Sequence, residues 1–558
     1  MAEIYKSTKN KNGKTFVSSV LLLSLSAILV KIIGLVYKIP MLSLLGAEGM
    51  GYFNSSYEIY ALLCLVATTG LPVAISMLVS SAMARSDGNS ERRLIFRNAL
   101  GIAFAFGTLG SIGLIVFCEE ISRTVGNYNA ASCIFAIAPS LLFVCIAGVY
   151  RGYFQGMNCM YPTALSQIIE VVGKLVFGVA FAYVAIKKGY GINIAAAFAT
   201  VGLSLGMMLS MLFLILQKFI KDKRNRKDGT PLKNNTSSRN GYFSRLLKIS
   251  VPITMSSLIM GVTRLMDMTM IFRRLQDIGV DTVSANEMYG AYTTLAMPVF
   301  SLIPSLITPI SLALVPALSS AIKRNSLNEQ TYVAQNALKL TVFFALPASF
   351  GISAFAGPLL NILFINQAET VEFVAPLLAI LGASVLFSCV ITTSNAILHA
   401  YMKTGVPIAS MICGALVKLI SEYFLIGDVR VGIFGAPVST LLCDLTVAII
   451  NLVNVIRLVP STKNILDSLW RIFVASLGAV SAAIAIYLPL SGNFESELFA
   501  VLLAAVIAIF VYIVLAFLVR AIVPEELELF PFGEKISNLF FKKYKIKNFS
   551  GWGGKNDG

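Results

Sequence analysis

Long apolar stretches separated by short polar segments run through almost the whole of this 558-residue chain. A helix needs roughly 20 apolar residues to cross a hydrocarbon core of about 30 Å, and most of the stretches reach that length. The pattern predicts an all-α polytopic membrane protein with fourteen spanning helices. We place them at residues 16–38, 56–83, 95–117, 130–154, 163–186, 192–217, 247–272, 288–321, 333–360, 371–400, 405–426, 432–456, 467–489 and 497–521.

The distribution of basic residues predicts how these helices are oriented. The chain carries a formal net charge of +16 although only 13% of its residues are charged. Lys and Arg gather in the N-terminal segment, in the loops that follow even-numbered helices and in the C-terminal tail. The opposite loops are acidic or sparsely charged, with Lys187, Lys188, Arg273 and Arg274 as exceptions. Because cytoplasmic loops are enriched in Lys and Arg, we expect both termini in the cytoplasm and the protein in the cell membrane. The basic excess then needs no nucleic-acid partner.

Short motifs recur in the same order in the two halves of the chain. Glu58-x-Tyr60 returns as Glu287-x-Tyr289, and Pro162 returns as Pro407. We therefore expect two pseudo-symmetric six-helix lobes related by an axis along the membrane normal, with the pathway between them, and two additional C-terminal helices. The predicted division is an N-terminal lobe at 1–217, a basic cytoplasmic linker at 218–246, a C-terminal lobe at 247–456, the extra helices at 457–523 and a basic cytoplasmic tail at 524–558.

Two cations are predicted at matching depths in the two lobes. Lys31 and Arg264 each lie about 15 residues into their helices, roughly 22 Å at 1.5 Å per residue. A charge in the membrane centre costs roughly 2.5–3.5 kcal/mol, which favours a polar cavity over lipid exposure. Lys38 lies on the same helix face as Lys31, and Asp267 is close enough along its helix to pair with Arg264. Snorkelling or local pairing is the alternative explanation, most of all for Lys38.

Further charged residues form candidate gating pairs. Residues Glu170 and Lys174 are four apart, as are Lys418 and Glu422, in equivalent helices of the two lobes, so each pair can satisfy itself and an exchange of its two charges should be tolerated. A structural clamp is the alternative role. Asp444 is a candidate proton or cation site, or an interhelical hydrogen-bond partner, and Arg151 is a candidate phosphate contact or a topology anchor. Two side chains complete the candidate cavity and gating set: Glu58 and Gln167.

Several kinds of chemistry are not expected. The eight cysteines are scattered without a CxxC pair and the chain has a single histidine, so we expect no metal site. The chain lacks the G-x-x-x-x-G-K-[ST] loop that binds nucleotide phosphates. We therefore expect no cofactor, and transport energised by an ion gradient, the membrane potential or the substrate gradient. Cations that face each other across a cavity suit an anionic substrate such as a pyrophosphate.

Four segments carry a resemblance to a known group of proteins. They are RGYFQG at 151–156, YPTALSQIIE at 161–170, NSSYEIY at 54–60, and PITMSSL at 252–258 with the following Arg264-x-x-Asp267. They resemble the stage V sporulation protein B group, which sits with the Gram-positive MurJ-like flippases in the multidrug/oligosaccharidyl-lipid/polysaccharide exporter superfamily. The resemblance implies two six-helix lobes with an extra helix pair and the flipping of undecaprenyl-linked sugars by alternating access. It also implies cavity-facing basic residues on the first helix, which Lys31 and Lys38 match as lysines where arginine is common.

The sequence therefore predicts a flippase for an undecaprenyl-pyrophosphate-linked sugar precursor rather than an enzyme, working as a monomer in the bilayer. The group includes cell-wall, spore-cortex and other polysaccharide flippases, so the resemblance does not identify the sugar of the substrate. An ion-coupled exporter of small drugs is one alternative, because the superfamily includes such proteins. A membrane glycosyltransferase or polymerase is another, but the expected outer loops are too short to hold a catalytic domain.

Overall fold

The computed structural model describes residues 2–83, 88–157, 159–227, 239–459, 466–490 and 494–519. All regular secondary structure in these ranges is helical, and thirteen of the helical segments there are long and apolar enough to cross a membrane. The predicted tail at 524–558 and residues 228–238 of the predicted linker at 218–246 lie outside the described residues. The division into lobes at residues 217 and 247 stays a prediction.

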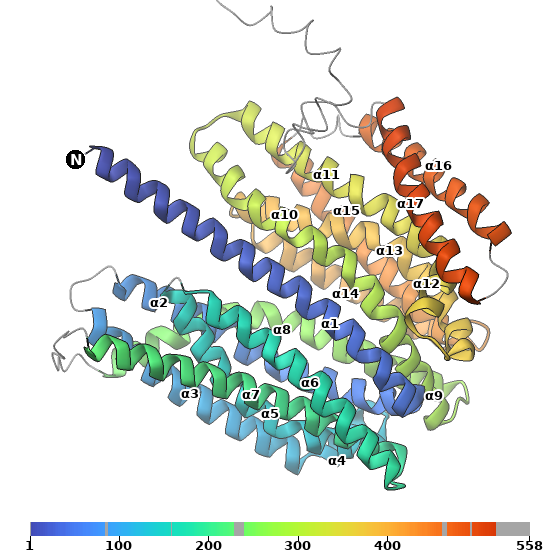
Figure 1. Ribbon diagram of the computed structural model, residues 1–558, viewed down its shortest axis with the longest axis horizontal. Coiled ribbons are helices and arrows are strands. Elements are labelled where there is room, and N and C mark those ends of the chain that lie inside the picture. Colours follow the sequence, from blue (N-terminus) through green and yellow to red (C-terminus); the bar gives the residue numbers. More distant parts are fainter. Residues whose placement is uncertain are drawn as a thin grey trace, which may run out of the picture.

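The first two predicted helices are continuous in the structure. Helix α1 (Ala2–Leu65) contains a sharp kink at Gly46, whose φ of 67° and ψ of 179° lie in a region that only glycine adopts readily. It continues through the π-helical turn η1 (Val66–Gly70) into α2 (Leu71–Met83). Figure 1 shows α2 at the same left-hand end of the molecule as the beginning of α1. The chain therefore reverses direction at the kink, where the sequence predicted a loop. Because the helix is continuous, Leu29–Leu65 is a single candidate span.

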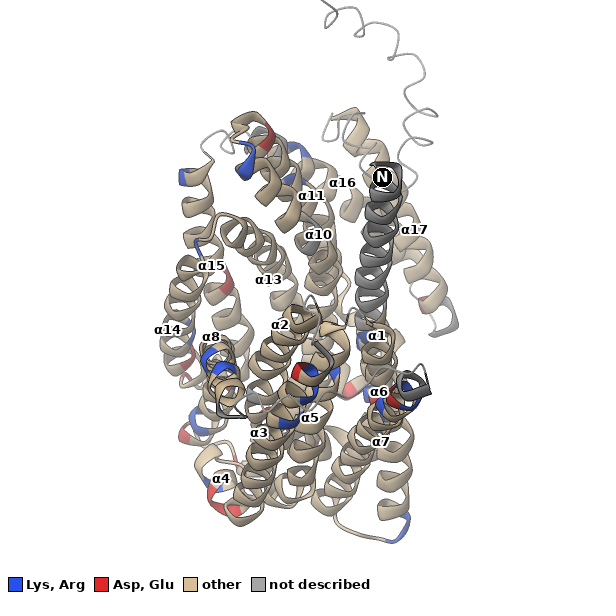
Figure 2. Ribbon diagram, turned by 90° about the vertical axis from the view of Figure 1, so that its left-hand side faces the viewer, with Lys and Arg blue, Asp and Glu red and all other residues tan. Residues whose placement is uncertain are grey.

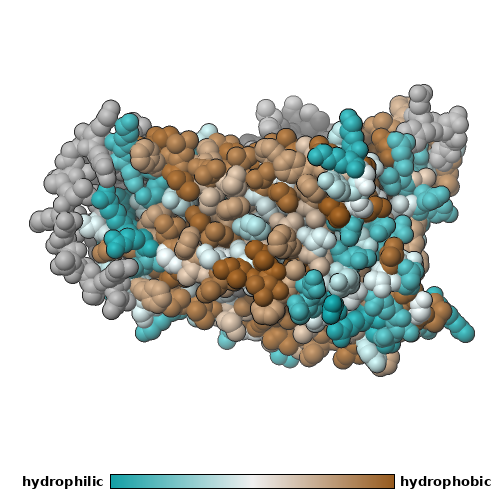
Figure 3. All heavy atoms as spheres, turned by 90° about the horizontal axis from the view of Figure 1, so that it is seen from below, coloured by the Kyte–Doolittle hydropathy of each residue, from teal (hydrophilic) through white to brown (hydrophobic). Residues whose placement is uncertain are grey.

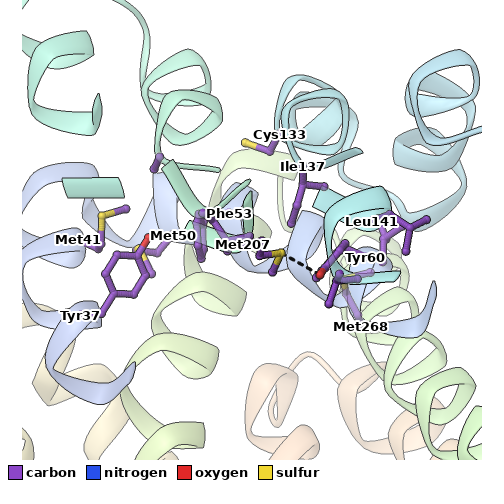
Figure 4. Close-up of a cluster of buried hydrophobic side chains, with 14 of the residues drawn as sticks. Tyr37, Met41, Met50, Phe53, Tyr60, Cys133, Ile137, Leu141, Met207 and Met268 are labelled. Carbon is purple, nitrogen blue, oxygen red and sulfur yellow. Dashed lines mark hydrogen bonds between the residues drawn. The ribbon is translucent and has the colours of Figure 1, made fainter. Parts of the chain in front are cut away.

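The remaining helices of the first half follow in a compact bundle (Figure 1). They are α3 (Gly88–Val116), α4 (Cys118–Val125), the short turn η2 (Tyr128–Ala130), α5 (Ala131–Gly156), α6 (Tyr161–Lys187) and α7 (Ile192–Lys227). Figure 4 shows part of the apolar core that they form with α1. In that core the hydroxyl of Tyr60 lies 3.0 Å from the sulfur of Met207. We call α1–α7 the first half of the molecule.

The second half runs from α8 (Arg239–Asp277) to the last described helix. Its other elements are α9 (Thr282–Ala291), the π-helical turn η3 (Tyr292–Ala296), α10 (Met297–Lys323), α11 (Leu327–Ala354), α12 (Ala356–Leu363), α13 (Ala368–Ala400), α14 (Gly405–Ile426), the turn η4 (Gly432–Phe434), α15 (Gly435–Leu458), α16 (Leu466–Leu490) and α17 (Phe494–Leu518). The last two helices pack against each other and α11, where the Tyr512 hydroxyl donates to the Phe343 carbonyl at 2.6 Å.

The internal repeat is visible in the irregularities of the helices. Phe117 interrupts the first half between α3 and α4, and Phe355 interrupts the second half between α11 and α12 in a similar backbone conformation. Each π-helical turn, η1 and η3, is followed by one residue and then a proline, Pro72 or Pro298. Proline has no N–H to donate, so both helices lose a hydrogen bond at this point and widen. The two halves share these defects, as expected of a duplication.

The surface matches a protein embedded in a bilayer. Figure 3 shows a hydrophobic middle flanked by hydrophilic ends. Leu109, Phe424 and Phe510 leave 71%, 69% and 67% of their surface exposed, which is reasonable only against lipid. Figure 2, viewed from the end where α1 begins, shows Lys and Arg at several helix ends among mostly uncharged helices. The chain is a multi-pass membrane protein.

Helix α8 contacts both halves of the molecule. Near its beginning the Tyr242 hydroxyl donates to Glu91 of α3 at 2.7 Å, and it packs on α2 and η1. Near its other end it packs on α14, where Arg274 donates to the carbonyl of Tyr423 at 3.0 Å. A shift of α8 would therefore change its contacts with both halves of the molecule.

Candidate functional site

The two cations predicted at matching depths, Lys31 and Arg264, are both exposed side chains of spanning helices. Lys31 of α1 is exposed, and its ammonium group donates to the hydroxyl of Ser305 in α10. Arg264 of α8 is also exposed and lies within electrostatic range of Lys31. Three helices thus bring two cations together inside a segment that is otherwise apolar. Like charges at this depth repel each other, so the arrangement favours an anion between them.

Lys38 binds the carbonyl that the π-helical turn leaves free. Its Nζ atom lies 2.7 Å from the main-chain oxygen of Thr293 in η3. The N–H of Met297 bonds to Tyr292 instead, and Pro298 has no N–H to offer. Lys38 also lies within electrostatic range of Glu58, a half-buried residue of α1 beyond the Gly46 kink. Lys38 therefore ties α1 to the second half of the molecule, and its role as a substrate contact stays a prediction.

Around Lys38 a polar interface joins the two halves at one end of the bundle. We call this the α9 end: it carries the Gly46 kink, α4 and α9. The side-chain amide of Asn54 donates to the hydroxyls of Thr293 and Thr294 at 2.9 and 2.8 Å. Asn286 receives a bond from Asn127 at 2.7 Å and donates to the Glu48 carbonyl at 2.7 Å. These buried and partly buried bonds join the two halves at the α9 end.

Further contacts extend the same interface. Arg273 donates to the carbonyl of Thr124 and Gln276 to that of Gly126, each at 2.7 Å. At the centre the backbones of Gly51 and Gly290 cross so closely that a Cβ on Gly290 would lie 2.5 Å from the nitrogen of Gly51. Small residues permit such close helix crossings in membranes. The α9 end is both hydrogen-bonded and tightly packed.

A second charged group lies between α8 and α14, and it differs from the predicted pairing. Asp267 does not pair with Arg264: its Oδ1 lies 2.8 Å from Nζ of Lys418. The expected partner of Lys418, Glu422, is farther away, at 3.6 Å, and completely buried. The prediction considered only neighbours within one helix, whereas the packing of α14 on α8 supplies Lys418 with a nearer carboxylate. Glu58 lies within electrostatic range of this group and of Arg264.

A third charged group belongs to the first half alone. Glu170 pairs with Lys174 at 3.0 Å, as predicted, and also with Arg151 at 2.8 Å. Arg151 donates further bonds of 3.0 Å to the hydroxyls of Ser166 and Ser210. Its guanidinium is thus held by α6 and α7, so a phosphate would have to compete with these partners. Gln167 is half-buried on α6 in the turn before Glu170.

The remaining candidate, Asp444 of α15, accepts a hydrogen bond of 2.7 Å from Ser384 of α13 and lies within electrostatic range of Lys418. This is the interhelical bond that was one of its two predicted roles. Among the described residues there is no group of three metal-ligating side chains.

An apolar cavity of about 460 Å³ opens between α11, α13, α15 and α16. Leu386, Ala448, Trp470 and Phe473 are among its lining residues, and the lining is almost wholly hydrocarbon. A site of this kind suits an acyl or polyprenyl chain rather than a sugar.

Comparisons with known proteins show the family to which the chain belongs. A family model described as "Polysaccharide biosynthesis protein" matches residues 16–322. The chain belongs to this family. A second model, MatE, matches residues 252–424. The chain is 27% identical to Stage V sporulation protein B of Bacillus subtilis (strain 168), over 93% of this chain and 98% of that protein. It is 24% identical to Lipid II flippase MurJ of the same organism, over 71% and 75%.

Solved structures show the same fold. The inward closed conformation of lipid II flippase MurJ matches with a TM-score of 0.68 at 18% identity, over 90% of this chain and 99% of that one. An inward-facing multidrug resistance MATE family transporter matches with a TM-score of 0.65 at 14% identity, over 81% and 98%. The predicted fold class is confirmed, except that the count of fourteen spans is not. Among these matches, one relative is named a lipid II flippase and one solved structure a multidrug resistance transporter.

The uncharged members of the site were not predicted from the sequence. Asn54, Asn286 and Thr293 carry most of the bonds at the α9 end, but asparagine and threonine are common in helices and gave no signal by themselves. Pro298 did offer a signal, because a proline within a span frees a carbonyl that some donor has to satisfy.

Proposed function

We propose that this protein flips an undecaprenyl-pyrophosphate-linked sugar precursor, such as lipid II or a related cell-wall or polysaccharide intermediate, across the cell membrane by alternating access. The names of its relatives support this proposal, since they include a lipid II flippase and a sporulation protein. Family membership in polysaccharide biosynthesis points to the same class of substrate.

The observation that carries the proposal is that Lys31 and Arg264 lie within electrostatic range of each other. These cations come from α1 and α8 and repel each other at membrane depth. A pyrophosphate between them converts that repulsion into two charge-assisted interactions. Arg264 offers a planar fork for bidentate binding, whereas Lys31 acts as a point charge. Pyrophosphate is common to all lipid-linked precursors of this type, so these contacts do not select the sugar.

The apolar cavity supports the lipid part of the proposed substrate. A cavity of about 460 Å³ is too small for a whole polyprenyl chain. A portion of the chain can lie between α13, α15 and α16 while the rest stays in the bilayer. The substrate then spans two environments: a charged centre for the pyrophosphate and a hydrocarbon groove for the chain.

We further propose that both termini lie in the cytoplasm, as the basic loops indicate. The α9 end then faces outward, and its hydrogen bonds close the molecule on that side. The described state accordingly corresponds to an outwardly closed transporter. Movement of the two halves has to break these contacts to release the substrate outside.

Export of small cationic or neutral compounds is the second candidate, because the MatE model matches residues 252–424. The charges of Lys31 and Arg264 distinguish between these two candidate substrates. Paired cations repel a cationic drug and attract a pyrophosphate, so the geometry favours the lipid-linked precursor.

The experiment is flipping by the purified protein in liposomes that contain a fluorescent undecaprenyl-pyrophosphate sugar. Protection of the fluorophore from an impermeant quencher reports its position. Flipping of the pyrophosphate lipid, but not of the matching monophosphate without sugar, supports the proposal. Transport of cationic dyes without flipping would overturn it. Depletion of the protein in cells then identifies the sugar, because the natural substrate accumulates.

A further inference from the structure

Glu422 is a buried carboxylate that lacks hydrogen-bond partners. Its side chain is completely inaccessible, and both of its carboxylate oxygens lack a donor among the described residues. Lys418 is closer to Asp267, at 2.8 Å, than to Glu422, at 3.6 Å. Taking an ionised carboxylate out of water without donors is costly. The position is therefore poorly suited to a glutamate that stays charged.

The neighbour that Glu422 does have is another carboxyl group. Asp267 of α8 lies within hydrogen-bonding reach of Glu422 of α14. Two ionised carboxylates are both acceptors and cannot bond to each other, but a protonated one donates through its O–H. Closely placed carboxyl groups in a poorly solvated site hold one proton between them. A single proton would give Glu422 the bond that it lacks.

We propose that Glu422 and Asp267 form a proton-binding site between α8 and α14 that couples transport to the proton gradient. The proton comes from water on one side of the membrane, binds to Glu422 and is donated in a hydrogen bond to Asp267. Asp267 keeps its charge and its pairing with Lys418. Binding turns a group with one excess negative charge into a neutral one, and release to water on the other side restores that charge. The coupling, but not the binding, rests on the proposed transport function.

The surroundings of the pair favour a proton over a metal ion. The ammonium of Lys418 already occupies the cation position beside both carboxyl groups. A metal ion would have to displace it or bind against its charge. The other titratable or charged side chains that face the pair are Glu58 of α1, Arg264 and Arg274 of α8, Tyr289 of α9, Tyr292 of η3, and Cys443 and Asp444 of α15. None of these is within bonding distance of the orphaned oxygens of Glu422.

The position of the pair in α8 explains how a proton can drive movement. Asp267 lies three residues after Arg264, one turn from the proposed pyrophosphate contact. When the proton leaves, the two carboxylates repel each other and loosen the contact of α8 with α14. Because α8 also packs on α2 and α3, this change reaches the first half of the molecule. Proton release and substrate binding are thereby linked through one helix.

The first test measures the proton itself and does not depend on flipping. Infrared difference spectroscopy of the purified protein between neutral and alkaline pH reports the carbonyl stretch of any protonated carboxyl group. We expect such a band in the wild type and its loss in E422Q, with the band kept in Asp444→Asn and in Glu287→Gln, an exposed glutamate of α9. A band that persists in E422Q, or disappears only in Asp444→Asn, would overturn the proposal.

Folding of the variant is itself informative. Glutamine matches a protonated glutamate in shape and can donate to Asp267, so E422Q should reach the membrane at wild-type level. Glu422→Ala should lose the same infrared band. Failure of E422Q to fold would show that the site needs a charged glutamate and would contradict the proposal.

The second test addresses coupling in the liposome assay. An imposed pH gradient should change the wild-type flipping rate several-fold, and E422Q should flip at a rate that no longer responds to it. A sodium gradient that drives the wild type in place of a pH gradient would overturn the coupling. If no variant flips any lipid, the proposed function fails while the infrared result still decides whether the proton binds.

Discussion

Lys38 in α1 donates a hydrogen bond of 2.7 Å to the main-chain carbonyl of Thr293, across the boundary between the two halves of the molecule. The carbonyl is available because Pro298 has no N–H and the N–H of Met297 bonds elsewhere. A main-chain carbonyl that lacks a helical partner in the second half thus receives its hydrogen bond from a charged side chain of the first half.

This relationship predicts that the effects of changing Lys38 and Pro298 are not additive. Lys38→Met should lower thermal stability in detergent, because a hydrogen bond to a charged group contributes about 1.5–3 kcal/mol. Pro298→Ala restores an N–H within the helix, so the additional loss from Lys38→Met should be at least halved in that background. A double-mutant cycle of unfolding temperatures provides the measurement. Simple additivity would show that the lysine does not depend on the freed carbonyl.

The crossing of Gly51 and Gly290 predicts that bulk at this point holds the α9 end apart. A Cβ at Gly290 would come within 2.0 Å of the Ala47 carbonyl oxygen, so Gly290→Leu cannot close without displacing α1. In a cysteine-free background, Ala47→Cys should react with an impermeant maleimide several times faster when Gly290→Leu is present. Gly101→Leu is the control, since nothing lies within 4 Å of its Cβ position. Equal labelling in all three proteins would contradict the closed interface.

The group of Arg151, Glu170 and Lys174 predicts that exchanging its charges fails. In a pair that is satisfied within one helix, the exchange E170K/K174E would be tolerated. Here Glu170 binds Arg151 as well, so the exchange places a lysine against an arginine in a buried site. Breaking a buried pair costs about 3–5 kcal/mol, and we expect the exchanged protein to be as poorly folded as Glu170→Ala. Fluorescence-detected size-exclusion chromatography measures the folded fraction. Wild-type behaviour of the exchange would show that Arg151 contributes little.

The apolar cavity predicts a dependence on the length of the lipid chain. Ala448 is buried in its wall, so Ala448→Phe should fill part of the cavity and slow flipping of an undecaprenyl substrate several-fold. A short-chain analogue that does not reach the cavity should be affected much less. Val506→Phe, on the exposed face of α17, is the matched control. Equal slowing for both chain lengths would remove the cavity from the account.

The sequence predicts the helical membrane fold well because span length and charge distribution are local signals. The electrostatic proximity of Lys31 and Arg264 fits their similar depth, because depth along a helix can be counted from the sequence. The pairing of Lys418 with Asp267 could not be predicted in this way, since it depends on how α14 packs on α8. The continuous α1–α2 unit was also missed, because a single glycine with positive φ replaces the polar loop that separates most spans.

The central claim is that Lys31 and Arg264 together bind the pyrophosphate of the substrate, and flipping in liposomes tests it most directly. Lys31→Ala and Arg264→Ala should each reduce the flipping rate at least tenfold at unchanged protein level, and Arg264→Lys should fall between, because it keeps the charge but loses the bidentate fork. Lys187→Ala, at the end of α6, should flip normally. Wild-type flipping by both alanine variants would contradict the account.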